Sequence, residues 1–195
     1  MMFKIRIHFL GLMLLLTACT NSTKNIESKS DSLYIKEGDS LVLATFDTLR
    51  ISLQKAIAQN GFEGAVSYCN VQALSLTNVY KSEDVTIKRV STQFRNHGNA
   101  PDSLEREVLK RLAAIQKPEL VRISVNEVHY FKPIIIQPMC LACHGNPQKD
   151  MQPAVVQAIN HLYPDDRAIN YKEGDLRGAW HIIFRNNSNE PISRL

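Results

Sequence analysis

Residues Cys140-Leu141-Ala142-Cys143-His144 form a Cys-x-x-Cys-His sequence, which is the attachment pattern of a c-type haem. In this pattern both thiols add to vinyl groups of the porphyrin, and the histidine reaches the iron from the same side of the ring. On a helical turn, Cys140, Cys143 and His144 stand at positions i, i+3 and i+4, so their side chains share one face. The spacing therefore predicts one covalently attached haem c, bound by Cys140 and Cys143, with His144 as an iron ligand.

Two other chemistries use a Cys-x-x-Cys pair, and neither explains the adjacent histidine. A structural zinc site needs four ligands, usually including a second Cys or His pair at short spacing, and the sequence has no such pair. A thioredoxin-like redox pair begins a helix after a buried strand and needs no histidine directly after it. Haem attachment is therefore the interpretation that uses all three side chains.

The N-terminus has the layout of a bacterial export signal, with Lys4 and Arg6 before an apolar run over residues 9–16. This run is too short and too close to the N-terminus for a membrane-spanning helix. It ends in Leu16-Thr17-Ala18-Cys19, which resembles the lipobox where a bacterial lipoprotein signal is cut and the cysteine is lipidated. We expect lipidation of Cys19 and a location on the periplasmic side of a bacterial membrane. The alternative is an ordinary signal peptide cut near the same place.

Composition divides the chain into a signal over residues 1–18, a flexible tether over residues 19–39, and one haem-binding domain over residues 40–195. The tether is predicted because this segment is rich in Ser, Asn, Lys and Glu and poor in apolar side chains. Removal of the signal with its two basic residues leaves 21 Lys and Arg (23 minus 2) against 19 Asp and Glu. A net charge near +2 (21 minus 19) predicts no nucleic-acid partner.

Apolar side chains recur at helical spacing in some segments and alternate in others. We expect helices over residues 41–60, 62–80, 103–117 and 153–162. We expect strands over residues 85–90, 121–125, 127–136 and 178–185. The second and third strands can pair as a hairpin, and Pro133 should place its strand at a sheet edge or a bulge because proline has no N–H to donate. This order of elements predicts an α+β fold with a small antiparallel sheet flanked by helices.

The second axial position of the iron decides between electron transfer, gas binding and catalysis. Cys69 is a candidate because it lies on an apolar helical stripe and has no cysteine left to pair with once Cys19, Cys140 and Cys143 are assigned. The equal alternative is that Cys69 is a small buried hydrophobe, a common role of free cysteine. Other candidates have ordinary alternative roles in loops, helices or strands: Met139, Met151, His97, His129, His161 and His181.

Four blocks of the sequence, in this order, resemble a family of bacterial periplasmic c-type haem-binding domains with a PAS-like fold, long described as a domain of unknown function. The blocks are residues 65–69, 89–102, 140–145 and 163–179, and the resemblance covers roughly residues 41–185. Two positions depart from the family pattern, because His97 replaces a usual proline and Leu104 replaces a common aromatic residue. Both departures affect packing near a loop more than the iron.

The resemblance implies an α+β, PAS-like domain whose N-terminal helices carry one haem ligand, and it implies that Cys69 is the axial ligand opposite His144. A thiolate opposite an imidazole stabilises ferric iron by its negative charge and lowers the reduction potential. Arg89, Arg95 and Asn96 are candidates to bind the haem propionates through charge-assisted hydrogen bonds. The equal alternative is that these three residues stabilise their own loop and its neighbouring turns.

These features predict a redox-responsive sensor or an electron carrier rather than an enzyme. Because the sequence contains no kinase, methyl-accepting or cyclase segment, a signal or an electron would pass to a separate redox or signalling protein. The alternative is a small haem enzyme, such as a peroxidase, or a gas-binding protein whose sixth ligand dissociates. A third hypothesis is a structural or partner-binding lipoprotein in which the haem is incidental.

Overall fold

The computed structural model describes residues 29–186, and residues 1–28 and 187–195 lie outside this description. The predicted export signal and the predicted lipidation site at Cys19 fall in the first of these two ranges. Within the part that is described, no helix is both long enough and apolar enough to cross a membrane.

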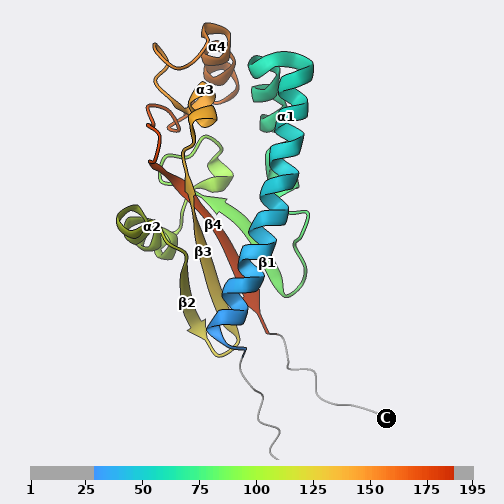
Figure 1. Cartoon of the computed structure of the whole chain (residues 1–195), viewed down its shortest axis with the longest axis vertical. Coiled ribbons are helices and arrows are strands. Elements are labelled where there is room, and N and C mark those ends of the chain that lie inside the picture. Colours follow the sequence, from blue (N-terminus) through green and yellow to red (C-terminus); the bar gives the residue numbers. More distant parts are fainter. Residues whose placement is uncertain (1–28, 187–195) are drawn as a thin grey trace, which may run out of the picture.

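Helix α1 (Asp31–Thr77) is the longest element and runs beside the sheet and beyond its end (Figure 1). The predicted helices over residues 41–60 and 62–80 are two arms of this element, separated at Gly61, where φ is 65° and ψ is −175°. A positive φ is accessible to glycine at little cost, so the chain bends there and the helix resumes. Gly61 thus interrupts the regular helix at the boundary between the two predicted helices.

The predicted tether over residues 19–39 is wrong in its last part, because α1 already begins at Asp31. Tyr34 and Val42 are buried against the sheet, and the Tyr34 ring centroid lies 5.2 Å from that of Phe184. Burial of these apolar side chains stabilises a first helical turn whose polar composition alone favours disorder.

Four strands form one antiparallel sheet in the order β1-β4-β3-β2, which confirms the α+β prediction. The strands are β1 (Val85–Val90), β2 (Glu119–Ser124), β3 (Glu127–Ile135) and β4 (Leu176–Arg185). Strands β2 and β3 form the predicted hairpin, and their pairing reaches Phe131 but not Pro133. The register between β3 and β4 shifts just after Pro133, at Ile134 and Ile135. The proline therefore lies at a locally free edge and beside a bulge, as predicted.

Helices cover both faces of the sheet, with α1 and α2 (Ser103–Ile115) on opposite sides (Figure 1). The first arm of α1 packs on a cluster that includes Tyr130 and Ile182. On the other face, Leu112 of α2 packs in a cluster with Phe131. Neighbouring strand residues alternate between these two cores, as the pleat of a strand requires.

Beyond the end of the sheet, the second arm of α1 lies against α4 (Pro153–Leu162), the helix at the top of Figure 1. Val66 of α1 packs there with Met151 and Val155, and Cys143 borders the same cluster. The Cys-x-x-Cys-His motif therefore lies at the end of the molecule where the second arm of α1 meets α4. Met151 is buried in this cluster, which fits a packing role.

Candidate haem site

The Cys-x-x-Cys-His motif forms a short helical turn, as its spacing predicts. A 3₁₀ turn, η2 (Pro138–Cys140), leads directly into α3 (Leu141–His144), and the N–H of Gly145 donates to the carbonyl of Leu141 at 2.9 Å. The N–H of Tyr171 donates to the carbonyl of His144 at 3.0 Å. The turn is therefore fastened to the segment that precedes β4.

The side chain of His144 is held in one orientation by its Nδ1 atom, which lies 2.8 Å from the carbonyl oxygen of Ala168. Because a carbonyl oxygen only accepts, Nδ1 carries the hydrogen, and a neutral His144 has its lone pair on Nε2. Burial lowers the pKa of His144 well below its ordinary value, and the charges of Arg177 and Arg95 lower it further. A neutral imidazole with one nitrogen bonded to a backbone carbonyl is the usual state of a metal-binding histidine.

Arg95 is engaged by groups within the protein. Its Nη2 atom donates to the carbonyls of Cys143 at 2.7 Å and Ala168 at 3.2 Å, and its guanidinium forms an ion pair with Asp166. Arg95 thus joins the carbonyl next to His144 to the carbonyl that orients the His144 ring. These contacts favour a positioning role for Arg95 over direct propionate binding.

Asn96 also has an internal partner, because its side-chain oxygen accepts from the N–H of Gly98 at 2.8 Å. It thereby caps the 3₁₀ turn η1 (His97–Asn99). For Asn96, as for Arg95, the hydrogen bonds favour the alternative that the residue stabilises its own loop.

A cavity of about 180 Å³ adjoins the motif and is lined by two of its three functional side chains, Cys140 and His144. The cavity lies at the end of the sheet where β1, β3 and β4 meet the motif. Its lining residues are Arg89, Val90, Ser91, Asn99, Ile134, Ile135, Ile136, Cys140, His144, Arg177 and Gly178. It thus combines an apolar wall from β3 with two basic side chains.

Arg89 is a half-buried cation without an ion pair in the described part of the chain. Its Nη2 atom donates to the carbonyl of Ala73 at 3.1 Å, whereas its buried Nε has no hydrogen-bond partner among residues 29–186. Burial lowers the pKa of Arg89 to about 10, and the charge of Arg177 acts in the same direction. Leaving a buried donor unpaired costs roughly 1–3 kcal/mol, so a compensating group is expected beside it.

Arg177 is the second basic residue of the cavity, and our sequence reasoning did not single it out. Its Nη1 atom donates to Ser91 Oγ at 2.8 Å and to the carbonyl of Gln93 at 3.0 Å. Burial lowers the pKa of Arg177, and among residues 29–186 it forms no ion pair. The only signal in the sequence was its place in the fourth family block, directly before Gly178.

Gly178 allows β1 and β4 to approach closely at the cavity wall. Its φ is 155°, and a Cβ atom there would lie 2.3 Å from the carbonyl oxygen of Val90. Any side chain at this position would clash with that backbone atom and push the two strands apart.

Cys69 lies on the second arm of α1, near the motif but not in the lining of the cavity. Its thiol is half-buried and free, and burial raises its pKa, while the charges of Arg89 and Arg95 act to lower it. Charge on Cys69 in turn acts on Cys143. The structure therefore brings Cys69 into the electrostatic neighbourhood of the predicted site, from a helix far earlier in the sequence.

The other candidate axial ligands have different surroundings. His129 and His181 are hydrogen-bonded to each other on the α2 face of the sheet, and His97 lies 3.2 Å from Asp165 at the surface. His161 and Met139 are exposed. Within residues 29–186, no group of three or more His, Cys, Asp or Glu is arranged to hold a metal ion. A haem fits these residues better than a bare ion, because the porphyrin supplies four iron ligands itself.

Comparison with known proteins places the chain in a family. The sequence model of the Tll0287-like family, described as Tll0287, matches residues 21–185, whereas the comparison with curated proteins gave no match. Among solved structures, the crystal structure of the cyanobacterial heme-protein Tll0287 is similar in fold, with a TM-score of 0.51 and 21% sequence identity. The match covers 80% of this chain and 94% of that one. The chain therefore belongs to the Tll0287-like family.

Proposed function

We propose that the chain binds one haem c, attached through Cys140 and Cys143, with Nε2 of His144 as an axial ligand. The observation that carries this proposal is the 2.8 Å hydrogen bond from His144 Nδ1 to the carbonyl of Ala168, inside a Cys-x-x-Cys-His turn. It leaves the coordinating nitrogen free and the ring orientation fixed. The description of the structural relative as a heme-protein supports the same assignment.

The two half-buried arginines of the cavity fit the carboxylates of a haem. Arg89 has an unpaired Nε, and Arg177 has no ion pair within the described residues. A propionate beside either guanidinium would supply the missing negative charge and accept charge-assisted hydrogen bonds. This assignment keeps Arg89 from the sequence prediction and adds Arg177. Arg95 then positions the motif, and Asn96 stabilises its own loop.

We assign the second axial position to Cys69. Burial raises the pKa of the Cys69 thiol, whereas the positive charges of Arg89 and Arg95 act to lower it, and Cys69 lies near Cys143 at the same end of the molecule. A haem with histidine and thiolate ligands supplies one-electron redox chemistry at low potential. The role that follows is a redox-responsive sensor or an electron carrier that works with a separate protein partner.

The proposed location is the periplasmic side of a bacterial membrane, with lipidated Cys19 as the anchor. It rests on the basic start, apolar run and lipobox-like residues of the first nineteen positions. A second function, a peroxidase-like enzyme or a gas-binding protein, is favoured by one observation. Cys69 does not line the cavity that His144 lines, which leaves that cavity available to a small ligand of the iron.

Optical and electron paramagnetic resonance spectra of the full haem-loaded chain separate these functions. We expect low-spin ferric iron with a thiolate signature that is lost in Cys69→Ala. An identical spectrum in Cys69→Ala would reject Cys69 as a ligand. High-spin iron that reacts rapidly with peroxide, or that binds carbon monoxide without a ligand change, would support the second function.

A further inference from the structure

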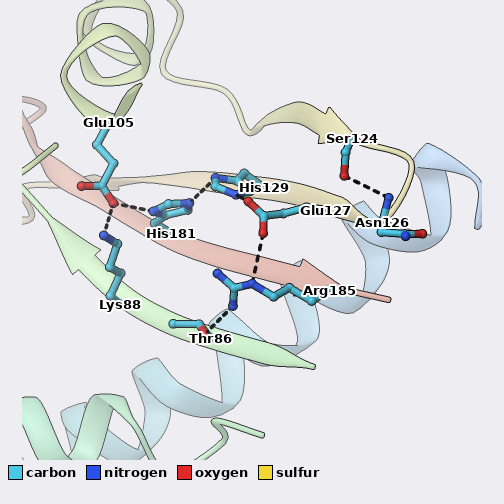
Figure 2. Close-up of polar contacts among 9 residues, drawn as sticks. All are labelled: Thr86, Lys88, Glu105, Ser124, Asn126, Glu127, His129, His181 and Arg185. Atoms are coloured by element: carbon cyan, nitrogen blue, oxygen red, sulfur yellow. Dashed lines mark hydrogen bonds and ion pairs between the residues drawn. The ribbon is translucent and has the colours of Figure 1, made fainter. Parts of the chain in front are cut away.

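A row of titratable side chains crosses the sheet face beneath α2 (Figure 2). Glu105 Oε1 lies 2.6 Å from His181 Nδ1, and His181 Nε2 lies 3.0 Å from His129 Nδ1. His129 Nε2 lies 2.8 Å from Glu127 Oε1. Three contacts at hydrogen-bond distance therefore connect two carboxylates through two imidazoles.

The row needs one more hydrogen than two neutral histidines supply. Each hydrogen bond contains one hydrogen, and a neutral imidazole carries a single N–H. If His181 donates to Glu105 and His129 donates to Glu127, the two facing nitrogens both present lone pairs at 3.0 Å. The third contact is attractive only when a third proton lies on an imidazole or on a carboxylate.

Both carboxylates are held in their ionised form by other groups. Glu105 accepts from Lys88 Nζ at 2.5 Å and, through its second oxygen, from the N–H of Asp102 at 2.8 Å. Glu127 accepts from Arg185 Nε at 3.1 Å. Burial alone raises the pKa of Glu105, but its hydrogen bonds from His181 and Lys88 outweigh burial and bring it to about 2. The third proton therefore belongs to the imidazole pair.

Of the two imidazoles, His129 is the better place for the positive charge. His181 is 1% exposed, and burial lowers its pKa, although its hydrogen bond to Glu105 acts in the opposite direction. His129 lies next to Glu127, whose pKa is lowered chiefly by the hydrogen bond from His129. On the neighbouring part of this face, Arg111 of α2 and Glu119 of β2 pair with each other and offer no further partner to the row.

We propose that the row from Glu105 through His181 and His129 to Glu127 is a proton-binding site that holds one proton beyond those of two neutral histidines. In the proton-bound form, His129 is an imidazolium that donates to Glu127 and to His181, and His181 is a neutral imidazole that donates to Glu105. The site shares no residue with the candidate haem site, so it stands or falls independently of haem binding.

Loss of the proton changes the contacts of the row. A neutral His129 can satisfy Glu127 or His181 but not both, because it then has one N–H for two acceptors. Either the two imidazole nitrogens repel each other, or the bare Nε2 of His129 faces the carboxylate of Glu127. The row thus acts as a pH-sensitive switch on the face of the sheet opposite α1.

Nitrogen NMR of the histidine side chains in the full chain, from about pH 5 to about pH 9, spans the ordinary imidazole range and tests the proposal directly. We expect His129 to carry hydrogens on both nitrogens at the acid end, while His181 is the neutral Nδ1–H form. As the pH rises, both rings should change in one common step with the release of one proton. Exposed His161 provides the matched reference for an isolated imidazole.

The variant His129→Asn keeps an N–H donor toward His181 but carries no titratable charge. In this variant we expect the His181 signals to stay in the Nδ1–H form across the whole range, and His161→Asn should leave the common step unchanged. Two neutral rings at every pH, or two steps that move independently in the unmodified chain, would overturn the proposal. Because the unmodified chain gives this result alone, a failure of His129→Asn to fold would not affect the conclusion.

Discussion

The α2 face and the cavity bury charge in opposite ways. Glu105 on the α2 face is completely buried, and both of its oxygens accept hydrogen bonds from within the chain. At the cavity, Arg89 and Arg177 are half-buried without an ion pair among residues 29–186, and the buried Nε of Arg89 has no hydrogen-bond partner there. Buried charges in proteins are normally compensated. The first region is therefore complete by itself, whereas the second is suited to a group of opposite charge.

Arg95 stands beside the cavity and shows what a compensated arginine looks like. It has Asp166 as an ion-pair partner and two backbone carbonyls as acceptors, whereas Arg89 has one carbonyl. Arg95 therefore holds the motif in place, whereas Arg89 has hydrogen-bonding capacity left for a ligand.

The largest effect on folding is expected from Arg95→Met, with Arg89→Met as the matched variant. Removal of Arg95 leaves Asp166 buried without its cation, which costs about 3–5 kcal/mol of unfolding free energy. Removal of Arg89 deletes a group that is itself incompletely paired, so we expect a change within about 1 kcal/mol. Urea unfolding in a Cys140→Ala/Cys143→Ala background, which cannot attach haem, measures both values. Equal losses in the two variants would show that Arg89 is as well compensated as Arg95.

The next largest effect is the pH dependence of the unfolding free energy that Glu105 causes. Its pKa is lowered from 4.5 to about 2 in the folded chain, so its stabilisation is complete above pH 4.5 and is lost as the pH falls toward 2. The shift corresponds to about 3 kcal/mol. In Glu105→Gln we expect lower stability at neutral pH and a flatter acid limb in unfolding followed by circular dichroism. Glu107→Gln, which removes an exposed carboxylate of the same helix, serves as the control and should keep the acid limb of the unmodified chain.

The smallest effect is expected at Gly61, the kink between the two arms of α1. The position has open space for a Cβ atom, so Gly61→Ala adds only the backbone cost of its φ of 65° and ψ of −175°, about 1–3 kcal/mol. Thermal unfolding measures this cost. A stabilised variant would mean that α1 is straight in solution and that its second arm, with Cys69, lies elsewhere.

Much of the fold can be predicted from the sequence, because the spacing of apolar residues follows the buried face of each helix or strand. The strand over residues 85–90 and the helix over residues 153–162 have the bounds that this periodicity predicts. The start of α1 was not readable, because residues 31–39 look like a polar tether unless the burial of Tyr34 against Phe184 is known. Long-range packing decided that segment, and local composition does not contain it.

The candidate site also has residues that the sequence predicts and residues that only the fold brings together. The spacing of Cys140, Cys143 and His144 follows from the chemistry of attachment, so it appears in the sequence itself. The importance of Arg177 depends on its hydrogen bond to Ser91, a residue 86 positions away along the chain, and its charge alone does not predict that contact. His129 and His181 were expected to have ordinary partners in the sheet, and they do, but their pairing across neighbouring strands needed the register of β3 and β4.

The central claim, covalent attachment of one haem at Cys140 and Cys143, is tested most directly by denaturing mass spectrometry of the full chain. The chain must be produced by export in a bacterium that attaches c-type haem. We predict that the polypeptide retains the mass of one haem after denaturation, that Cys140→Ala/Cys143→Ala loses it, and that Cys69→Ala retains it. A polypeptide without added haem mass, or haem that separates on denaturation, would contradict the account.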